Sequence, residues 1–427
     1  MNKRVLIISP YFAPVNAADM QRVRMSLPYF ANFGWEAEIV AVDPQYTELS
    51  KDVLLSQSVP FGTKIHYVKA FKKRWTAKFG LGSIALRSLY FYRNSVNKLL
   101  KNKHFDLIYF STTQFPVCIL GAYWKKKYGI PYIIDMQDPW HSEYYADKPK
   151  EQRPKKYWFS YRLNRYLEPK AMKAVDGLIS VSEKYITDLK DRYHSIINIP
   201  AKTVTFAAFA PDFEIARENS FRFDRILDPA FINLVYIGRG GHDMHKATEL
   251  LFDALSKKLK TSDDYHKLKI WFIGTSYAPA GQGIPTILPL AVKKGLASHV
   301  VEITDRISFY QTLLTLQQAD ALFVPGSDDP KYTASKIFPY IMAKKPLLAI
   351  FNKESSAITI LKEYEAKFVF NFDDQHIQQS IRSFLDMLLN RTLPLPEYRP
   401  AALAKYGALN MTQIQCEFFD KIVSEKI

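Results

Sequence analysis

The sequence predicts an α/β protein of two domains, each built on a doubly wound parallel sheet. Short apolar runs alternate with helical patterns along nearly the whole chain. The runs are apolar at consecutive positions, which is typical of strands in a parallel sheet that helices cover on both faces. The 427 residues exceed what one ordinary core accommodates and suit two domains of about 200 residues each.

The first series of elements defines an N-terminal domain over residues 1–205. We expect the apolar runs of this series to be strands separated by helices. Helical spacing occurs at 20–33 and 81–100, and a further helix begins at Glu183. These strands are expected at 5–10, 36–42, 106–111, 131–136 and 177–182.

A second series follows an irregular stretch, 206–230, whose prolines and charges indicate a linker. The C-terminal domain is placed at 231–395, and residues 396–427 form a helical tail, for which packing back on the N-terminal domain is one option. Ligands of such domains bind at the carboxyl ends of the strands, so two of them predict a central cleft. The expected strands are 233–238, 268–274, 300–304, 321–325, 347–351 and 367–372.

The net charge of +16 resides almost entirely in the N-terminal half. Residues 1–205 hold 32 Lys/Arg against 17 Asp/Glu, and residues 53–105 hold eleven basic residues and no acidic one. This imbalance favours anionic partners: a membrane surface, a phosphate-bearing lipid or nucleic acid. A lysine-rich solvated surface is the alternative. The segment 71–75, Phe-Lys-Lys-Arg-Trp, suits a membrane interface, whereas the helix at 81–100 can face either a membrane or its own core.

A glycine-rich loop between a strand and a helix predicts a phosphate site. The strand at 233–238 leads into RGGHDMHK. Gly238 and Gly240 permit a tight turn, and the helix that follows offers unpaired N–H groups to an anion. Arg239 and Lys246 add positive charge for a diphosphate. A purely structural turn is the alternative interpretation.

Two segments of the N-terminal domain are candidates for facing a phosphate or sugar in the cleft. In the loop after the first strand, Asn16 lies before a helix that carries Arg22, and both could face a ligand. The alternative interpretation of this segment is an ordinary capped helix with solvated arginines. After the strand at 131–136 come Asp138, Trp140 and His141. These side chains suit sugar hydroxyls and rings, although Asp-Pro is also a common turn element.

Several common catalytic patterns are absent from the sequence. It contains no D-x-D motif, which disfavours a carboxylate-bound metal, and no metal site is expected. HExxH, GxSxG, Walker A and GxGxxG motifs do not occur either. The two cysteines lie far apart without zinc-ligand spacing, which suits a reducing compartment.

Four stretches together resemble glycosyltransferase family 4. They are YFAPVNAADMQRVRMSLPYFANFGWEAEIV, NRYLEPKAMKAVDGLISVSE, YIGRGGHDMHKATELLFDAL and SKIFPYIMAKKPLLAI. The resemblance implies a GT-B fold, meaning two Rossmann-like domains that face a central cleft. It also implies a nucleotide-diphosphate sugar donor of the UDP or GDP type, no further cofactor, and metal-independent transfer with retention of configuration.

The resemblance carries site roles onto particular positions of this chain. Arg239 and Lys246 match the pair that neutralises the donor diphosphate. Ser335, Lys336 and Ile337 match the loop that approaches the phosphate or nucleotide. Asn16 and Arg22 match the N-terminal loop near the phosphates and the acceptor.

The chain also departs from the family pattern. The helix after the donor loop usually reads SKLFEYMA-x-GKP, and its glutamate holds the ribose, but Pro339 occupies that position here. The glutamate eight residues earlier is replaced by Lys331. Glu354, after the next strand, is a candidate replacement. Gln137 lies where many relatives carry a cleft histidine, for which His141 is a candidate substitute. With Arg239 and Lys246, we expect Asp138 and His141 to be catalytic, and Asn16, Arg22 and Trp140 to lie on the acceptor side.

The leading hypothesis is a cytoplasmic glycosyltransferase, peripheral on the inner face of the membrane, that extends a glycan or lipid-phosphate-linked acceptor of a surface polysaccharide. The missing carboxylates at 331 and 339 motivate the alternative of a non-catalytic binding or scaffold protein. A nucleotide-sugar epimerase is a third option. No nucleic-acid recognition module is visible.

Overall fold

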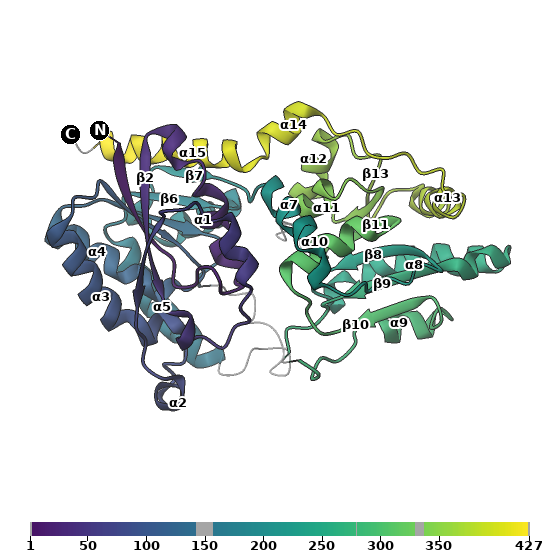
Figure 1. Cartoon of the computed structure of the whole chain (residues 1–427), viewed down its shortest axis with the longest axis horizontal. Helices are drawn as coiled ribbons and strands as arrows, with labels where there is room; N and C mark the ends of the chain where they lie inside the picture. The colour runs from purple at the N-terminus through teal and green to yellow at the C-terminus, as the bar shows by residue number, and fades with distance from the viewer. Residues whose placement is uncertain (1, 142–156, 279, 329–336, 426–427) are drawn as a thin grey trace. The chain divides into compact units, whose positions relative to one another are not determined.

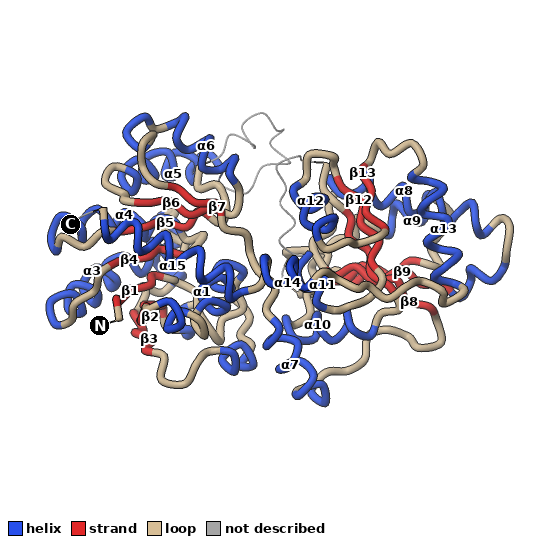
Figure 2. The backbone as a smooth tube through the Cα atoms, turned by 90° about the horizontal axis from the view of Figure 1, so that it is seen from above, coloured by secondary structure: helices blue, strands red, loops and turns tan. Residues whose placement is uncertain are grey.

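The computed structural model describes residues 2–141, 157–278, 280–328 and 337–425. The chain forms two compact units, residues 1–207 with 406–427 and residues 208–405 (Figure 1). Each unit has one parallel sheet with helices on both faces (Figure 2). This is the doubly wound architecture that the sequence predicts. Among the described residues, no helix has the length and apolar character needed to cross a membrane.

The N-terminal sheet has seven parallel strands in the order β3-β2-β1-β4-β5-β6-β7. The order reverses between β1 and β4, and at such a switch point open α/β sheets bind their ligands. All five strands expected from the sequence are confirmed. The strands are β1 (Lys3–Ile8), β2 (Trp35–Val42), β3 (Lys64–Val68), β4 (Leu107–Ser111), β5 (Tyr132–Met136), β6 (Gly177–Ser180) and β7 (Ala201–Thr203).

The two strands that the sequence did not predict, β3 and β7, lie at the two edges of this sheet. β3 reads KIHYV and β7 reads AKT, and most of their side chains are half-buried or exposed. An edge strand has only one neighbour and part of its surface in water, so it needs no continuous apolar run. In this sheet, apolar patterning therefore identifies the inner strands and misses both edges.

Helices cover both faces of the N-terminal sheet. Adjacent residues of β4 show this, because consecutive side chains of a strand point to opposite faces. The Tyr109 ring lies 5.0 Å from Phe419 of α15, whereas the Phe110 ring stacks 6.0 Å from Trp124 of α4. The helices of this unit are α1 (Gln21–Ser26), α2 (Lys73–Thr76), α3 (Ile84–Asn102), α4 (Ile119–Tyr128), α5 (Tyr157–Met172), α6 (Glu183–Arg192) and α15 (Ala408–Ser424).

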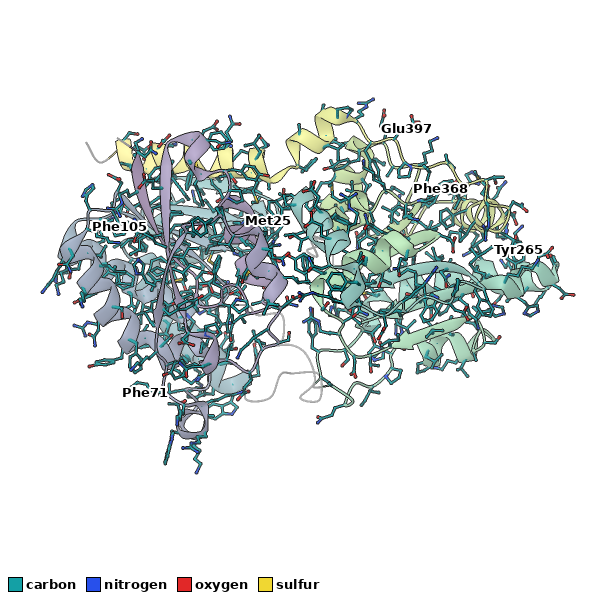
Figure 3. The ribbon with its side chains drawn as sticks, in the orientation of Figure 1. Met25, Phe71, Phe105, Tyr265, Phe368 and Glu397 are labelled. Carbon is teal, nitrogen blue, oxygen red and sulfur yellow. The ribbon has the colours of Figure 1, made fainter. Side chains whose placement is uncertain are left out.

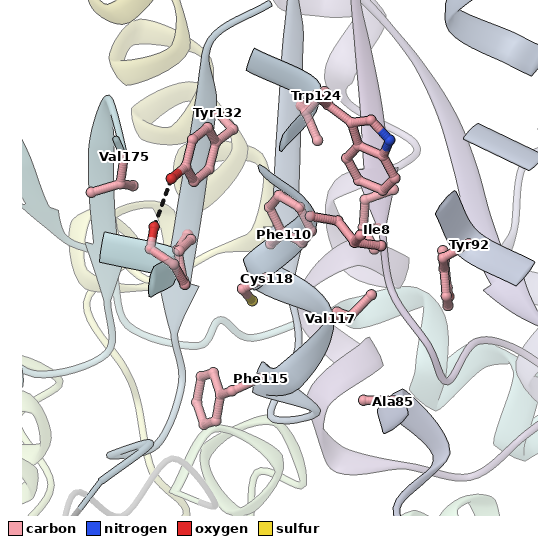
Figure 4. Packing of buried hydrophobic residues seen from close by; sticks show 14 of the residues in the cluster. Ile8, Ala85, Tyr92, Phe110, Phe115, Val117, Cys118, Trp124, Tyr132 and Val175 are labelled. Atoms are coloured by element: carbon pink, nitrogen blue, oxygen red, sulfur yellow. Dashed lines mark hydrogen bonds between the residues drawn. The ribbon is translucent and has the colours of Figure 1, made fainter. Parts of the chain in front are cut away.

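The face covered by α3 and α4 contains a large aromatic core (Figure 4). Phe110 meets Tyr132 edge-on at 6.0 Å, and the Tyr132 hydroxyl donates to the carbonyl of Ala171 at 2.6 Å. Gly121 of α4 permits this packing, because a Cβ there would lie 2.5 Å from the Tyr132 ring. The helix α3 buries its apolar side against the same core, including Tyr92, so that side of α3 is not available to a membrane.

The helix α15 belongs to the N-terminal unit although it ends the chain. Phe419 packs against Phe30 and Trp35, and the Trp35 indole N–H donates to Asp420 at 3.0 Å. Asp420 also pairs with Lys3 at 2.7 Å. The C-terminal helix therefore covers the sheet face that β1 and β4 would otherwise expose.

The C-terminal sheet has six parallel strands in the order β10-β9-β8-β11-β12-β13, and all six were expected from the sequence. They are β8 (Ile232–Ile237), β9 (Leu268–Ile273), β10 (Val300–Ile303), β11 (Ala321–Pro325), β12 (Leu347–Phe351) and β13 (Phe368–Asn371). Two helix pairs, α8 with α13 and α7 with α10, pack against each other. The helices are α7 (Ala210–Glu218), α8 (His245–Leu259), α9 (Leu288–Lys293), α10 (Phe309–Gln318), α11 (Ile337–Met342), α12 (Ser356–Glu363), α13 (Ile377–Leu389) and α14 (Pro400–Lys405).

The stretch 206–230, expected as a linker, contains the ordered helix α7. The units divide between Ala207 and Ala208. Asp212 of α7 accepts a hydrogen bond from the Tyr310 hydroxyl of α10 at 3.3 Å, and its side chain is buried. Most of this stretch is thus part of the C-terminal unit, and only its first residues belong to the N-terminal unit.

A buried carboxylate on β2 organises one end of the N-terminal sheet. Glu38 is 4% exposed and accepts from His66 at 2.7 Å and from Lys103 at 2.9 Å, with Arg4 as a third partner. Desolvation acts to raise the pKa of Glu38, but hydrogen bonds from His66, Lys103 and Arg4 outweigh it and lower the pKa to about 2. The network links β1, β2, β3 and the residue after α3.

Replacing Glu38 by Gln should lower the free energy of unfolding at pH 7 by about 2 kcal/mol, because three charged or polar partners lose a buried anion. The lowered pKa means that the wild-type advantage is complete above about pH 4.5 and disappears as the pH falls towards 2. Denaturant unfolding at pH 7 and pH 2.5 measures it. Glu36→Gln, an exposed site on the same strand, is the control. Equal stability of the two variants at pH 7 would contradict this role.

Candidate functional site

The glycine loop of the C-terminal unit lies at the carboxyl end of β8, as the sequence predicts. The N–H of Gly238 donates to Ile273 at 2.8 Å and that of Gly240 donates to Thr275 at 2.9 Å, so both extend the pairing with β9. A Cβ on Gly240 would lie 2.9 Å from Cβ of Thr275. Glycine at 240 is therefore required by the close approach of two loops, whatever ligand the loop binds.

Arg239 projects from this loop and is half-buried. Its guanidinium donates two hydrogen bonds to Asp243, from Nη1 at 2.8 Å and from Nη2 at 2.6 Å. Asp243 also accepts from the Ser327 hydroxyl at 2.8 Å, and its carbonyl accepts from the N–H of Asp328 at 2.8 Å. Asp243 thus joins the loop after β8 to the loop after β11.

Sequence reasoning missed Asp243, although its spacing of four residues from Arg239 was a usable signal. Desolvation acts to raise the pKa of Asp243, but hydrogen bonds from Arg239 and Ser327 outweigh it, and the net pKa lies below the usual value. The carboxylate is therefore ionised at neutral pH. It occupies the same two-pronged guanidinium face that a phosphate would use.

Lys246 lies in the first turn of α8, with its side chain exposed. Its ammonium is 3.4 Å from Asp373 and 4.8 Å from the centre of the Phe372 ring, both of which follow β13. Arg239 and Lys246 therefore come from one loop–helix segment but pair with different carboxylates. An exposed pair at 3.4 Å contributes little to stability, so Lys246 can exchange its partner at small cost.

The donor-loop predictions are described only in part. Ser335, Lys336 and Lys331 lie outside the described residues. Ile337 begins α11 and is fully buried, so only its backbone can approach a ligand. Glu354 is exposed in the loop after β12, where its N–H donates to Asn352 at 3.0 Å. The amide of Asn352 donates to the carbonyl of Asp328 at 3.3 Å, which joins this loop to the loop after β11.

Tyr340 fixes α11 against the end of β8 and was not predicted as a site residue. Its hydroxyl accepts from the N–H of Ile237 at 2.8 Å and donates to the carbonyl of Ile237 at 3.0 Å. Ile237 directly precedes the glycine loop. The Tyr340 side chain thus fixes α11 to Ile237, and thereby sets the position of α11 relative to Arg239.

A half-buried carboxylate shapes the neighbouring loop. Glu302 of β10 accepts from the N–H groups of Ile287 at 2.9 Å and Leu288 at 2.7 Å, and from the Thr275 hydroxyl at 2.7 Å. Thr275 is also the residue that Gly240 approaches. Glu302 therefore holds the loop that limits the space beside Gly240, a role that the sequence pattern did not reveal.

On the N-terminal unit, the structure changes the role of Arg22. We expected it on the acceptor side, but it is fully buried, with Nε 2.8 Å from the equally buried Asp135. Its Nη2 donates to the carbonyl of Val204 at 2.8 Å, and Nη1 donates to that of Thr205 at 3.2 Å. Burial of a charge requires such partners, so Arg22 joins α1 to the ends of β5 and β7.

Trp140 and His141 are also buried and form part of the packing. Trp140 stacks on Phe115 at 5.4 Å, and its indole N–H donates to Asn164 at 3.2 Å. The backbone N–H of His141 donates to the buried Glu168 at 3.2 Å, and its ring lies 4.6 Å from Tyr161. Neither side chain presents a free face to a sugar in this unit, contrary to expectation.

Asn16 and Asp138 remain accessible at the carboxyl edge of the N-terminal sheet. Asn16 is half-buried, and its N–H donates to the carbonyl of Ser50 at 2.9 Å. Asp138 is exposed, yet desolvation by the surrounding protein, followed by repulsion from Asp19, raises the pKa of its carboxyl to about 6. It is the predicted acceptor-side residue best suited to contact a ligand.

Asp19 lies at the centre of a buried polar group. Its carboxylate accepts from the hydroxyl of Thr112 at 2.8 Å and the N–H of Thr113 at 3.1 Å. Gln137 donates to its carbonyl at 3.0 Å. Burial raises the pKa of Asp19. These contacts connect the loops after β1, β4 and β5, which surround the switch point.

Within the described ranges, no three His, Cys, Asp or Glu side chains form a cluster suited to a metal ion. Among the described residues, the positive groups on the carboxyl edge of the C-terminal sheet include the side chains of Arg239 and Lys246 and the N-terminus of α8.

Comparison with known proteins agrees with the fold of two parallel-sheet domains. Residues 29–205 match the model of Glycosyltransferase Family 4. No curated protein matches the chain. Among solved structures, the chain is similar to sucrose-phosphate synthase from Thermosynechococcus elongatus, with a TM-score of 0.62 and 13% identity over 99% of this chain and 100% of that one.

Two further solved structures are similar over nearly their whole length. One is the UDP-forming α,α-trehalose-phosphate synthase from Burkholderia xenovorans in complex with glucose-6-phosphate, with a TM-score of 0.59 and 11% identity over 97% of this chain and 100% of that one. The other is TarM, with a TM-score of 0.60 and 11% identity over 98% and 99% of the two chains. At these identities the likeness shows the GT-B fold.

The end of α11 offers a test of the local backbone. Lys344 has a φ of 54°, the left-handed region that favours glycine, and family 4 usually carries glycine at this position. Lys344→Gly should raise the free energy of unfolding by about 1 kcal/mol. Lys345→Gly, at a position without positive φ, should lower it by about 0.5–1 kcal/mol. Thermal and denaturant unfolding measure both, and a destabilising Lys344→Gly would contradict the assignment.

Proposed function

We propose that this chain, a glycosyltransferase of the GT-B fold whose N-terminal domain matches Glycosyltransferase Family 4, uses a nucleotide-diphosphate sugar as donor. The acceptor is a glycan or a lipid-phosphate-linked saccharide of a surface polysaccharide. Transfer proceeds without a metal ion and with retention of the anomeric configuration. The observation that carries the proposal is the Arg239 and Lys246 segment at the carboxyl end of β8.

The chemistry of the donor explains why these cations matter. When the glycosidic bond to the diphosphate breaks, negative charge grows on the leaving phosphate, and the enzyme must stabilise it. Arg239 offers two parallel hydrogen-bond donors, and Lys246 offers a mobile point charge. The N-terminus of α8, a helix of 15 residues, adds the positive end of the helix dipole. Each cation now faces a carboxylate, Asp243 or Asp373, and the diphosphate would replace these anions.

Asp243 has a specific part in this scheme. It orients Arg239 and keeps the loop after β11 close to the glycine loop. When a phosphate takes its place on the guanidinium, Asp243 keeps its bonds from Ser327 and Asp328. It is therefore a positioning residue for the donor site.

The acceptor side rests on Asp138 at the carboxyl edge of the N-terminal sheet. A carboxylate with a pKa of about 6 is ionised at neutral pH but basic enough to accept a strong hydrogen bond from an acceptor hydroxyl. The excess positive charge of this half suits a phosphate-linked acceptor at an anionic membrane surface.

The alternative of a non-catalytic binding protein has one specific motivation. Pro339 replaces the ribose-binding glutamate, so ribose must be bound by another group, for which we propose Glu354. Calorimetry against UDP- and GDP-sugars separates the two functions, since a protein that binds none of them cannot be the transferase proposed here. An epimerase would instead release an isomer or free sugar without any acceptor.

Arg239→Ala and Lys246→Ala should each lower kcat/KM for the donor by about 100-fold, equivalent to roughly 2.7 kcal/mol of transition-state stabilisation. Donor turnover is measured by mass spectrometry with membrane extract as acceptor, and the anomeric configuration of the product by NMR. Lys257→Ala, at an exposed position of α8, should leave turnover unchanged. Full activity in both site variants would refute the donor-site assignment.

The pH dependence tests Asp138. Because its pKa is raised to about 6, the reactive ionised form increases as the pH rises through 6, and kcat/KM should rise over pH 5–7. Asp138→Asn should lower kcat/KM by about 100-fold and remove this rising limb. Glu36→Gln provides a matched charge removal far from the switch point. A limb that persists in Asp138→Asn would assign the ionisation to another group.

A further inference from the structure

An exposed group of aromatic and basic side chains occupies the connection between β3 and α3. Phe71 is 50% exposed, Trp75 66% and, on α3, Tyr90 60%. The same segment carries Lys69, Lys72, Lys73, Arg74 and Lys78. We call the side chains of Phe71, Lys72, Arg74, Trp75 and Tyr90 the aromatic–basic patch.

The rings of Phe71 and Tyr90 are joined through Phe91, and further exposed aromatic side chains lie nearby in the same unit. The Phe71 ring lies 5.0 Å from Phe91, and Phe91 lies 5.4 Å from Tyr90. On the other side, a Cβ on Gly80 would lie 2.6 Å from the ring of Phe159, so the start of α5 adjoins residue 80. The neighbour of Phe159, Trp158, is 64% exposed and lies 5.7 Å from the guanidinium of Arg162. Single exposed aromatics are common, but a connected group of this kind is not.

A buried arginine holds the base of the patch in place. Arg87 of α3 donates from Nη1 to the carbonyl of Phe71 at 2.8 Å and from Nη2 to the carbonyl of Tyr46 at 2.9 Å. The N–H of Phe71 donates to the carbonyl of Arg87 at 3.0 Å. The backbone below the ring is therefore fixed, while half of the Phe71 surface stays exposed.

The charge of the patch is of one sign. Residues 53–105 contain no acidic side chain, and Glu48, from the preceding segment, pairs with Lys73. Arg74 lies 5.4 Å from the Trp75 ring. Exposed tryptophan and tyrosine next to lysine and arginine are the combination that partitions into the interface of an anionic bilayer.

The position of the patch fits such a surface. Every strand of the sheet is parallel, so α2, which follows β3, lies at the same carboxyl edge as the loops with Asp19 and Asp138. Figures 1 and 3 show α2, with Phe71 beside it, projecting at one end of the N-terminal unit. We propose that the aromatic–basic patch binds the surface of an anionic phospholipid bilayer. The bilayer then lies on the same side of the N-terminal sheet as the loops proposed to contact the acceptor.

Vesicle binding itself requires neither donor nor acceptor. The proposal rests on the proposed function only where it places the bilayer on the same side of the sheet as the acceptor. The full-length protein is sedimented with vesicles of phosphatidylcholine alone and with 30% phosphatidylglycerol. Binding to the anionic vesicles should be at least about 10-fold tighter and should fall steeply between 0.1 and 0.5 M salt. Equal binding to both vesicles, or to neither, would overturn the proposal.

Two variants locate the binding surface. Lys72→Glu with Arg74→Glu should weaken binding by at least about 100-fold, because each basic charge near an anionic surface changes affinity about 5-fold. Phe71→Ser with Trp75→Ser should weaken it by about 10-fold. These side chains are exposed, so thermal midpoints should stay unchanged, which separates lost binding from lost folding.

The matched control is Lys257→Glu with Lys293→Glu, which makes the same charge change on exposed residues of the C-terminal unit. It should alter vesicle binding by less than about 3-fold. Loss equal to that of the patch variant would indicate a non-specific charge effect and overturn the assignment. Binding of single-stranded DNA without binding of vesicles would assign the patch to nucleic acid instead. Arg239→Ala should bind vesicles normally, so failure of the donor-site assignment remains distinguishable.

Discussion

Parallel strand pairing brings the carboxyl ends of all strands in a sheet to one edge, and the polar chemistry of both units depends on this constraint. The inner strands are apolar on both faces, so side chains that bind ligands cannot lie within the sheet. They lie in the loops after it. In the C-terminal unit these loops carry Arg239 and Glu354, and in the N-terminal unit they carry Asn16, Asp19 and Asp138.

At these edges the same ion-pair chemistry serves two purposes, and burial decides between them. Arg22 and Asp135 are both fully buried, so separating them would leave each charge without its counter-ion in a place that water does not reach. Arg239 and Asp243 form an equally short pair, but about a quarter of each side chain is exposed. An anion from solution can therefore reach Arg239 but not Arg22. The first pair is structural, and the second can exchange its anion.

Sequence reasoning predicted what patterning determines directly. Apolar runs identified eleven of the thirteen strands, and the glycine-rich loop with its arginine was placed correctly at the end of β8. Burial of individual polar residues was not predictable. Arg22, Trp140 and His141 read as ligand-binding side chains, yet each is buried through partners distant in the chain, namely Asp135, Asn164 and Glu168. Only the tertiary fold supplies those partners.

The helix α11 shows why a lost carboxylate does not imply a lost site. Pro339 is the third residue of α11, where the N–H that proline lacks would have no partner within the helix, and its carbonyl still accepts from Ala343 at 3.0 Å. Tyr340 meanwhile keeps both hydrogen bonds to Ile237. The scaffold that aligns α11 with the glycine loop is thus independent of residue 339. What the substitution removes at the proposed donor site is one hydrogen-bond acceptor for a ribose, and the exposed Glu354 lies on the adjacent loop, which Asn352 joins to the loop after β11. If this edge holds a nucleotide-diphosphate sugar, as proposed, the substitution changes how the nucleoside is held and leaves in place the cations that would stabilise the departing diphosphate.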